Sequence, residues 1–492
     1  MSKKARFHLY IPEWAVVLLV TLLGAVARFS FIAKSSIWHD EGFSIALATR
    51  TPVEIWAGSA RDVHPPLYYL LLHFWMSLFG TSQLAVRSLS TLAGIAVIPL
   101  GYIIVKKMAG KRAAVLAGFM LALAPFLIRY SQEARMYGLL GLIMLAAFYA
   151  VMCIVENPKK IWPYILYALA IALGMYTHYF AALAAVSFWA YLVVLQSPKR
   201  WRFEKTIFLS AKWWLANILA LIIFLPWAPN ALAQIRRAQG LGWLPKASLR
   251  TFHDTVWQFF TFTDARQIVS ALYWLVPVLI LALAVYLLVT DRSREKYMRL
   301  LVSYSFLPIA AALLVSLQKP IFHERYFAFS AIGIYIIVAI AVSRLAGKRS
   351  WLFVVMSLLV LSTELVGVRN VYSQANHQMG PVVQTINNNY LPNDSILAGE
   401  LYVYFDASYY NKTGQKILLY TANSNLNGYG ESGLLYDKSV YVASYDKFKS
   451  GDRVWLIGKT GQHDYYQQVP QSWLLLQEFS AGYGEARLYQ VK

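Results

Sequence analysis

Long apolar stretches, separated by short polar loops, make up the first three quarters of the chain. Most of them approach the ~20 residues that a helix needs to cross a hydrocarbon layer of about 30 Å. They predict membrane-spanning helices at about residues 13–33, 82–105, 113–129, 138–155, 161–177, 179–196, 206–228, 267–290, 300–317, 326–343 and 351–369. The chain is therefore expected to be a polytopic α-helical membrane protein with about eleven transmembrane helices.

The pattern changes from about Val371 onward, where short β-rich runs alternate with Asn, Tyr, Gly and Asp. After a helical stretch at 380–390, strands are expected at 395–399, 402–405, 417–420, 439–443, 454–458, 473–476 and 486–491. Such a mixture is typical of a soluble α/β domain. We therefore predict a transmembrane domain at residues 1–370 and a C-terminal soluble α/β domain at residues 371–492.

Residues 64–79 are also apolar, and as a further span they would raise the number to twelve. The segment is short for a span, however, and it begins with two prolines among aromatic residues, which is an interfacial composition. If it lies in the interface, 17 basic residues of the later loops fall on the cytoplasmic side, as the distribution of Lys and Arg in membrane proteins requires. These residues are Lys106, Lys107, Lys111, Arg112, Lys159, Lys160, Lys199, Arg200, Arg202, Lys205, Arg292, Arg294, Lys296, Arg299, Arg344, Lys348 and Arg349. We therefore predict eleven spans in the plasma membrane, with the N-terminus (MSKKAR) cytoplasmic and the C-terminal domain extracytoplasmic.

The composition supports a membrane protein, since 58% apolar and 14% charged residues are unusual for a soluble multidomain chain. The formal net charge of +21 would suit nucleic-acid binding. Because the basic residues lie in short loops between apolar runs, we expect no nucleic-acid partner. Cys153 is the single cysteine, which excludes a disulfide within the chain and a thiolate metal cage.

The loop between the first two spans concentrates residues that can carry chemistry. Asp40 and Glu41 lie shortly after the first span, where a carboxylate can act as a general base or hold a divalent cation with His64. In the alternative interpretation, Asp40 is only the cap of a helix. His64 lies in the run Asp62-Val-His-Pro-Pro-Leu67, whose prolines fix the backbone. The alternative here is a turn that carries a surface histidine.

Three more polar clusters are predicted on the same outer face, at residues 130–137, 177–179 and 318–326. Together with the start of the second span, they contribute Arg135, His178, Arg325 and Arg87 as candidate residues. Cations at span ends are costly against lipid and are therefore functional candidates, and arginine binds phosphate with two parallel hydrogen bonds. For Arg135 the alternatives are an ion pair with Glu133 or Glu324, or an extension to the lipid headgroups. For His178 the alternative is a buried structural role, and for Arg87 it is an interfacial anchor.

Two of these motifs together, Asp40-Glu41 after the first span and Asp62-Val-His-Pro-Pro-Leu67, resemble the protein O-mannosyltransferases and their bacterial family-39-like relatives. The lipid A aminoarabinose transferases are more distant kin. The bacterial relatives also show a block like Tyr130–Tyr137 and a Phe79-Gly80 turn that leads to an arginine such as Arg87. The resemblance covers about residues 10–200 and implies a GT-C fold with its active site on the outer face. Where the mannosyltransferases continue with Gly-Lys, this chain has Tyr68-Tyr69, and it lacks their inserted β-trefoil.

The resemblance implies inverting transfer of a sugar from a polyprenyl-phosphate donor to a hydroxyl of a glycan, lipid or protein acceptor, with Asp40 as the base. The expected site residues are Asp40 and Glu41 for catalysis, His64 and His178 for orienting the acceptor or a metal, Arg135, Arg325 and Arg87 for the donor phosphate, and Glu133 and Tyr137 as further members. No general acid is needed, because polyprenyl phosphate leaves as a stable anion, and no cofactor is required. A divalent metal on Asp40, Glu41 and His64 stays an alternative.

Two other functions fit a polytopic membrane protein with basic outer loops. A transporter or flippase for lipid-linked sugars would show charges at mid-membrane depth or broken helices in paired halves. An envelope polysaccharide polymerase or ligase would not need the Asp-Glu and His-Pro-Pro motifs. The predicted charges cluster at one face instead, so the glycosyltransferase is the expectation.

Overall fold

The computed structural model of the chain describes residues 12–195, 207–237, 244–263, 271–293, 295–374, 378–422, 438–461, 466 and 468–492. The segment MSKKAR, which predicts a cytoplasmic N-terminus, lies outside these residues. The same holds for part of the predicted cytoplasmic loops, namely Lys199, Arg200, Arg202, Lys205 and Arg294.

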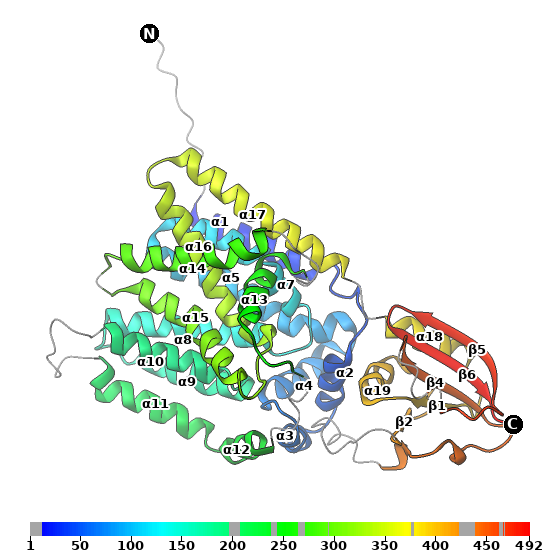
Figure 1. Cartoon of the computed structure of the whole chain (residues 1–492). Helices are drawn as coiled ribbons and strands as arrows, with labels where there is room; N and C mark the ends of the chain where they lie inside the picture. The colour runs from blue at the N-terminus through cyan, green and yellow to red at the C-terminus, as the bar shows by residue number, and fades with distance from the viewer. Residues whose placement is uncertain are drawn as a thin grey trace, which may run out of the picture.

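Each of the eleven predicted spans coincides with one or more helices (Figure 1). The helices of this part are α1 (Glu13–Phe29), α2 (His39–Ala48), α3 (Pro52–Arg61), α4 (Leu67–Phe79), α5 (Gln83–Ala109), α6 (Lys111–Leu123), α7 (Pro125–Ser131), α8 (Tyr137–Glu156), α9 (Trp162–Thr177), α10 (Ala181–Leu195), α11 (Ala211–Phe224), α12 (Ala228–Arg237), α13 (Leu249–Thr261), α14 (Ala271–Thr290), α15 (Tyr297–Ser316), α16 (Ala328–Ala346) and α17 (Ser350–Ser373). In the described part of the chain, six helices are long and apolar enough to cross a membrane, or eight if each of two bent pairs counts as one span. The number eleven therefore stays a prediction.

Prolines and small residues explain the local shape of the bundle. The bend of 49° between α6 and α7 falls at Pro125, whose ring cannot continue the preceding helix. Gly138 lets α8 approach α5 so closely that a Cβ atom would lie 2.7 Å from the carbonyl oxygen of Ser90. Such close contacts are typical of helix packing in membranes. The centre of the bundle is α16, which is buried along almost its whole length.

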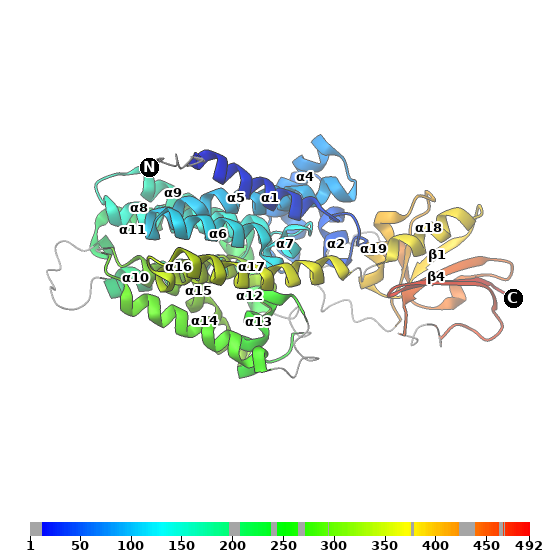
Figure 2. The ribbon, with the colours of Figure 1, turned by 90° about the horizontal axis from the view of Figure 1, so that it is seen from above.

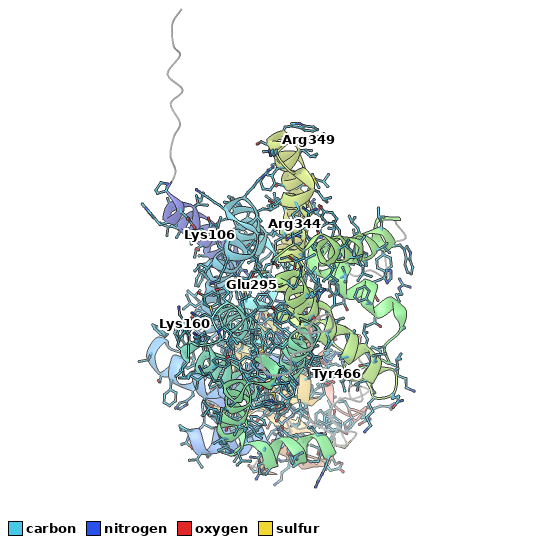
Figure 3. The ribbon with its side chains drawn as sticks, turned by 90° about the vertical axis from the view of Figure 1, so that its left-hand side faces the viewer. Lys106, Lys160, Glu295, Arg344, Arg349 and Tyr466 are labelled. Carbon is cyan, nitrogen blue, oxygen red and sulfur yellow. The ribbon has the colours of Figure 1, made fainter. Side chains whose placement is uncertain are left out.

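The bundle has two chemically different ends. At one end the predicted cytoplasmic loops contact one another, since Arg112 donates to the carbonyl oxygen of Gly347 (2.5 Å) and Lys107 pairs with Glu156 (2.6 Å). Figure 3 looks onto this end, where it labels Lys106, Lys160, Glu295, Arg344 and Arg349. At the other end lie α2, α3, α4 and the C-terminal sheet (Figures 1 and 2). Within the described residues, the basic loops thus share one end, as the charge pattern predicted.

Helix α4, which contains the disputed residues 67–79, begins and ends at the same end of the bundle. It starts just after His64, whose ring lies 5.6 Å from that of His178. Just past its end, the carbonyl oxygen of Thr81 accepts a hydrogen bond from Tyr409 of the C-terminal part (2.7 Å). Because both ends of α4 lie at the same end of the bundle, α4 does not cross it. This is the arrangement that the eleven-span prediction requires.

The C-terminal part holds a six-stranded sheet in the order β3-β2-β1-β4-β6-β5. Strands β1 to β4 pair in parallel, whereas β6 pairs antiparallel with β4 and β5. The elements are α18 (Met379–Asn389), β1 (Ser395–Ala398), α19 (Leu401–Tyr410), β2 (Leu418–Tyr420), β3 (Tyr441–Val442), β4 (Arg453–Lys459), β5 (Leu474–Ala481) and β6 (Gly484–Gln490). The predicted mixed α/β character is therefore present.

The strand predicted at residues 402–405 is wrong, because these residues belong to α19. Alternating aromatic and β-branched residues favour a strand. As a helix, however, the segment places Tyr402 and Phe405 against α2, where their rings lie 4.3 Å and 5.9 Å from that of His39. Burial of this helical face overrides the local preference.

Candidate active site

Asp40 lies in the first turn of α2, and its carboxylate faces two guanidinium groups from distant parts of the chain. Nη1 of Arg325 is 3.0 Å from Oδ2 of Asp40, and Nη2 of Arg135 is 3.9 Å from the same oxygen. Arg135 also donates to the hydroxyl of Ser44 (3.1 Å) and to the carbonyl oxygen of Asp40 (3.2 Å). Because Trp38 occupies the cap position of α2, the alternative that Asp40 only caps this helix does not apply.

The two arginines determine the charge of Asp40. Burial alone would raise the pKa of this carboxyl, but the positive charges of Arg325 and Arg135 outweigh the burial and hold the pKa well below its usual value. Asp40 is therefore ionised at neutral pH. While both arginines contact it, the carboxylate is a weak base.

Arg325 lies among aromatic rings, in the short 3₁₀ helix that precedes α16. Its guanidinium carbon is 5.4 Å from the ring centroid of Trp38, 5.8 Å from that of Tyr326 and 5.9 Å from that of Tyr137. These distances permit cation–π attraction. The hydroxyl of Tyr137 is buried and has no hydrogen-bond partner among the described residues, which is unusual for a buried polar atom. A ligand atom beside Asp40 would satisfy it.

Glu41 and Arg87 form a buried ion pair next to Asp40. Nε and Nη2 of Arg87 donate to the two carboxylate oxygens of Glu41 (2.7 Å and 2.6 Å). The remaining donors of Arg87 bind the carbonyl oxygens of Ile32, Ser35 and Ser36. All five N–H groups of this guanidinium are thus used within the protein. The pair fastens α2 and the preceding loop to α5, and Arg87 has no donor left for a phosphate.

Asp62 and His64 form a second polar pair on the other side of the site. Oδ2 of Asp62 lies 3.3 Å from Nδ1 of His64 and accepts a hydrogen bond from the hydroxyl of Tyr69 (3.3 Å). The His64 ring faces that of His178, at 5.6 Å. Burial and the neighbouring charge of His64 hold the pKa of His178 well below its usual value. The backbone N–H of Phe180 donates to Nδ1 of His178 (3.2 Å), which leaves the Nε2–H of the neutral ring as a donor.

Glu133 is buried beside this site and pairs with Arg129 (2.9 Å). The sequence had suggested an ion pair between Glu133 and Arg135 as an alternative, and this pair is not formed. The Oε2 atom of Glu133 has no partner among the described residues. Burial raises the pKa of Glu133, although the charge of Arg129 opposes the shift.

The candidate metal ligands do not make a metal site in this geometry. Both oxygens of Glu41 accept hydrogen bonds from Arg87, and Oε1 also accepts one from the backbone N–H of Ala134 (2.8 Å). Over the described ranges of the chain, no three His, Cys, Asp or Glu side chains are placed together to hold a metal ion. The oxygen-and-imidazole set of Asp40, Glu41 and His64 therefore does not fit a cation here.

Helix α19 packs directly against the back of α2. Gly42 permits this approach, because a Cβ atom there would lie 2.9 Å from the carbonyl carbon and oxygen of Phe405. The hydroxyl of Tyr410 accepts a hydrogen bond from the backbone N–H of Ile37 (2.7 Å), which lies just before the first residue of α2. The C-terminal part thus supports the helix that carries Asp40.

The structure thus brings together the four segments that the sequence placed on one face. Sequence reasoning missed Tyr69, whose hydroxyl contacts Asp62 and lies 3.5 Å from Nη1 of Arg135. It also missed Ser44, which binds Arg135. Helical spacing could not signal the contact between Asp62 and Tyr69, because residues 62–66 are not helical and α4 begins only at Leu67.

The described part of the chain is a largely helical bundle, one end of which holds a carboxylate flanked by two arginines. The resemblance drawn from the sequence is confirmed, because residues 63–229 match the family described as dolichyl-phosphate-mannose-protein mannosyltransferase. No curated protein matches the chain in sequence.

Solved structures share this fold over most of the chain. ArnT from Cupriavidus metallidurans, bound to undecaprenyl phosphate, is similar over 97% of this chain and 98% of its own, with a TM-score of 0.62 and 14% identity. The apo oligosaccharyltransferase of Archaeoglobus fulgidus matches 91% of this chain and 69% of its own, with a TM-score of 0.54 and 13% identity. The complex of the Archaeoglobus enzyme with Zn and sulfate matches 82% and 62%, with a TM-score of 0.53 and 14% identity. At these identities the likeness concerns the fold.

Proposed function

We propose that the chain is a membrane glycosyltransferase that moves a sugar from a polyprenyl-phosphate donor to an acceptor hydroxyl, with inversion at the anomeric carbon. The observation that carries the proposal is the Asp40 carboxylate between the guanidinium groups of Arg325 and Arg135. The family match of residues 63–229 and the fold shared with ArnT support it.

In this proposal, Arg325 and Arg135 bind the donor phosphate. A polyprenyl phosphate leaves as a stable anion, so the reaction needs fixed positive charge at the departing group rather than a general acid. Nε of Arg135 has no partner among the described residues and can donate to a phosphate oxygen. The guanidinium groups are already held in place, by Ser44 for Arg135 and by aromatic rings for Arg325.

Donor binding then activates Asp40. A phosphate competes with the carboxylate for the two arginines, and loss of these contacts raises the pKa of Asp40 toward that of a useful base. The carboxylate takes the proton of the acceptor hydroxyl, whose oxygen attacks the anomeric carbon. As this bond forms, the bond between the anomeric carbon and the phosphate oxygen breaks on the opposite face. Its electron pair leaves with the polyprenyl phosphate.

The other candidate residues receive supporting roles. We assign Glu41 and Arg87 to holding the loop, because they bind each other. His64, oriented by Asp62, and His178 face the same space and orient the acceptor. The unpaired hydroxyl of Tyr137 completes the ligand contacts, and Glu133 positions Arg129. No step is routed through a metal.

We place the site on the outer face of the plasma membrane, in a multi-pass chain of eleven spans with its N-terminus in the cytoplasm. The common end of the basic loops supports this orientation. Residues 1–370 would form the transmembrane catalytic domain, and residues 371–492 the extracytoplasmic domain. The acceptor is a glycan, lipid or protein hydroxyl.

The test is sugar transfer by the purified chain with a panel of polyprenyl-phosphate sugars, measured as release of the polyprenyl phosphate. Asp40→Asn should lower the rate by about 10²–10⁴-fold, the usual contribution of a general base. The matched control is Asp446→Asn, at an exposed position of the C-terminal part. Transfer near the wild-type rate in a folded Asp40→Asn protein would remove Asp40 from the mechanism. No release with any donor would refute the proposed function.

A further inference from the structure

A polar hollow lies at the outer ends of α1, α7 and α17, apart from the contacts around Asp40. We call it the lateral pocket and define it by Phe31, Lys34, Arg87, Arg129, Val371 and Tyr372. It opens to solvent, and the empty space at it, counted together with that open solvent, is about 330 Å³. Neither Asp40 nor the arginines that bind it line the pocket. Glu41 and Arg87 lie between the two places, since Arg87 lines the pocket and binds Glu41.

Three cations line the lateral pocket, whereas no carboxylate lies among its described lining residues. All N–H donors of Arg87 form hydrogen bonds within the protein, but its positive charge still acts on the pocket. Arg129 uses Nη2 on Glu133, and its other nitrogens have no partner in the described part of the chain. Lys34 is exposed and donates one hydrogen bond, to the carbonyl oxygen of Tyr372 (2.8 Å). Two cations with spare donors thus face one hollow, as anion recognition requires.

The backbone around the pocket is unusual. Phe31 has a φ of 60°, in the left-handed region that a bulky residue rarely adopts. Such strain is found preferentially where a fold holds a ligand. The turn that contains Phe31 and Lys34 connects the end of α1 to the end of α17. The Phe31 and Tyr372 rings pack with their centroids 5.1 Å apart, and Lys34 donates to the carbonyl oxygen of Tyr372.

The surroundings indicate that the anion belongs to a lipid. Phe31 is 61% exposed, and α1 and α17 continue from the pocket with exposed apolar residues such as Val26 and Val366. An apolar helix surface below a cationic hollow matches a lipid, whose acyl chains follow the helices while its phosphate lies at their ends. We propose that the lateral pocket binds the phosphate of a membrane lipid, held by Lys34 and Arg129. This proposal is independent of the transfer reaction.

The test uses the full chain, purified in detergent and exchanged into micelles that contain phosphatidylglycerol and phosphatidylcholine in equal amounts. Native mass spectrometry then counts the lipids retained. The wild type should retain phosphatidylglycerol in preference. Lys34→Gln should reduce this retention about two- to fivefold, as expected for an exposed cation. Arg129→Gln combined with Glu133→Gln, so that no buried carboxylate loses its partner, should reduce it about tenfold. The matched control, Arg250→Gln with Lys319→Gln, removes two exposed cations outside the pocket and should change nothing.

Three results would overturn the proposal. The first is equal retention of both lipids by the wild type. The second is unchanged retention of phosphatidylglycerol in the folded Lys34→Gln protein. Because Lys34 is exposed, this substitution should leave the fold intact. The third is displacement of the bound lipid by inorganic phosphate, which would assign the pocket to free phosphate. None of these measurements requires a sugar donor or an acceptor, so failed binding would leave the proposed transfer untouched.

Discussion

Replacing Glu41 by leucine would remove one half of a buried ion pair and leave the other half in place. Glu41 is 0% exposed, and the side chain of Arg87 is 3% exposed. Loss of one partner of such a pair costs about 3–5 kcal/mol, because the remaining charge is buried without compensation. Arg87 would keep three carbonyl partners, but the backbone N–H of Ala134 would lose its acceptor, which adds about 1–3 kcal/mol. We expect about 4 kcal/mol or more of destabilisation.

A double-mutant cycle separates this ion pair from the packing of the side chains. In the double variant Glu41→Leu with Arg87→Met, no charge remains buried, so the loss should be smaller than the sum of the two single losses by at least about 1 kcal/mol. The assay is thermal unfolding of the detergent-solubilised chain, followed by tryptophan fluorescence. The matched control is Glu13→Leu with Lys106→Met, at a pair whose side chains are 37% and 47% exposed. It should cost about 1 kcal/mol at most.

Two outcomes would refute this reasoning. If Glu41→Leu lowered the unfolding midpoint no more than removal of the exposed pair, the buried pair would not be what fastens the loop to α5. If the double variant were as destabilised as the sum of the single variants, the two residues would act independently.

Three further predictions concern the surroundings of Asp40. Burial raises the pKa of Asp406 to about 7, although the hydrogen bond from Tyr483 and the charges of His39 and Lys459 oppose the shift, and Glu41 adds to it. The pKa in the unfolded chain is about 3.9, so the stability from Asp406 is complete below about pH 4 and is lost as the pH rises through about 7. Asp406→Asn should therefore flatten the fall of the unfolding midpoint between about pH 5 and about pH 8, and an unchanged slope would contradict this account. Gly42→Ala should loosen α19 from α2, because the new Cβ atom would meet the backbone of Phe405, and limited proteolysis should release the C-terminal part sooner than in the wild type. Tyr69→Phe should slow transfer about fivefold through lost hydrogen bonding, whereas equal slowing in Tyr68→Phe, whose hydroxyl contacts Ser90, would indicate a general packing effect.

The helices could be predicted from the sequence because the length of an apolar run and the charges that flank it are properties of the local sequence. The chain breaks between α6 and α7 at Pro125, which hydropathy alone passed over as one continuous run. The segment 402–405 was assigned to a strand because its local preference says nothing of the surface against which it packs. That surface is α2, more than 350 residues away in sequence.

The site could be predicted in part. The sequence placed Asp40, Arg135 and Arg325 on one face, and the structure brings them into contact. It could not reveal that Arg87 binds Glu41, because any of the three candidate arginines of the outer face could have done so. Which cation meets which carboxylate depends on the final placement of helices that are 40 to 300 residues apart. Periodicity identifies the exposed face of a helix, but it does not identify the partner.

The contact between Gly42 and Phe405 limits how this architecture can be recombined. A chimaera that took its C-terminal part from another member of the class would bring a different side chain or a different helix end to the back of α2. Even a small mismatch there would displace the Asp40 carboxylate from Arg325 and Arg135. Helices α19 and α2 therefore have to be inherited together.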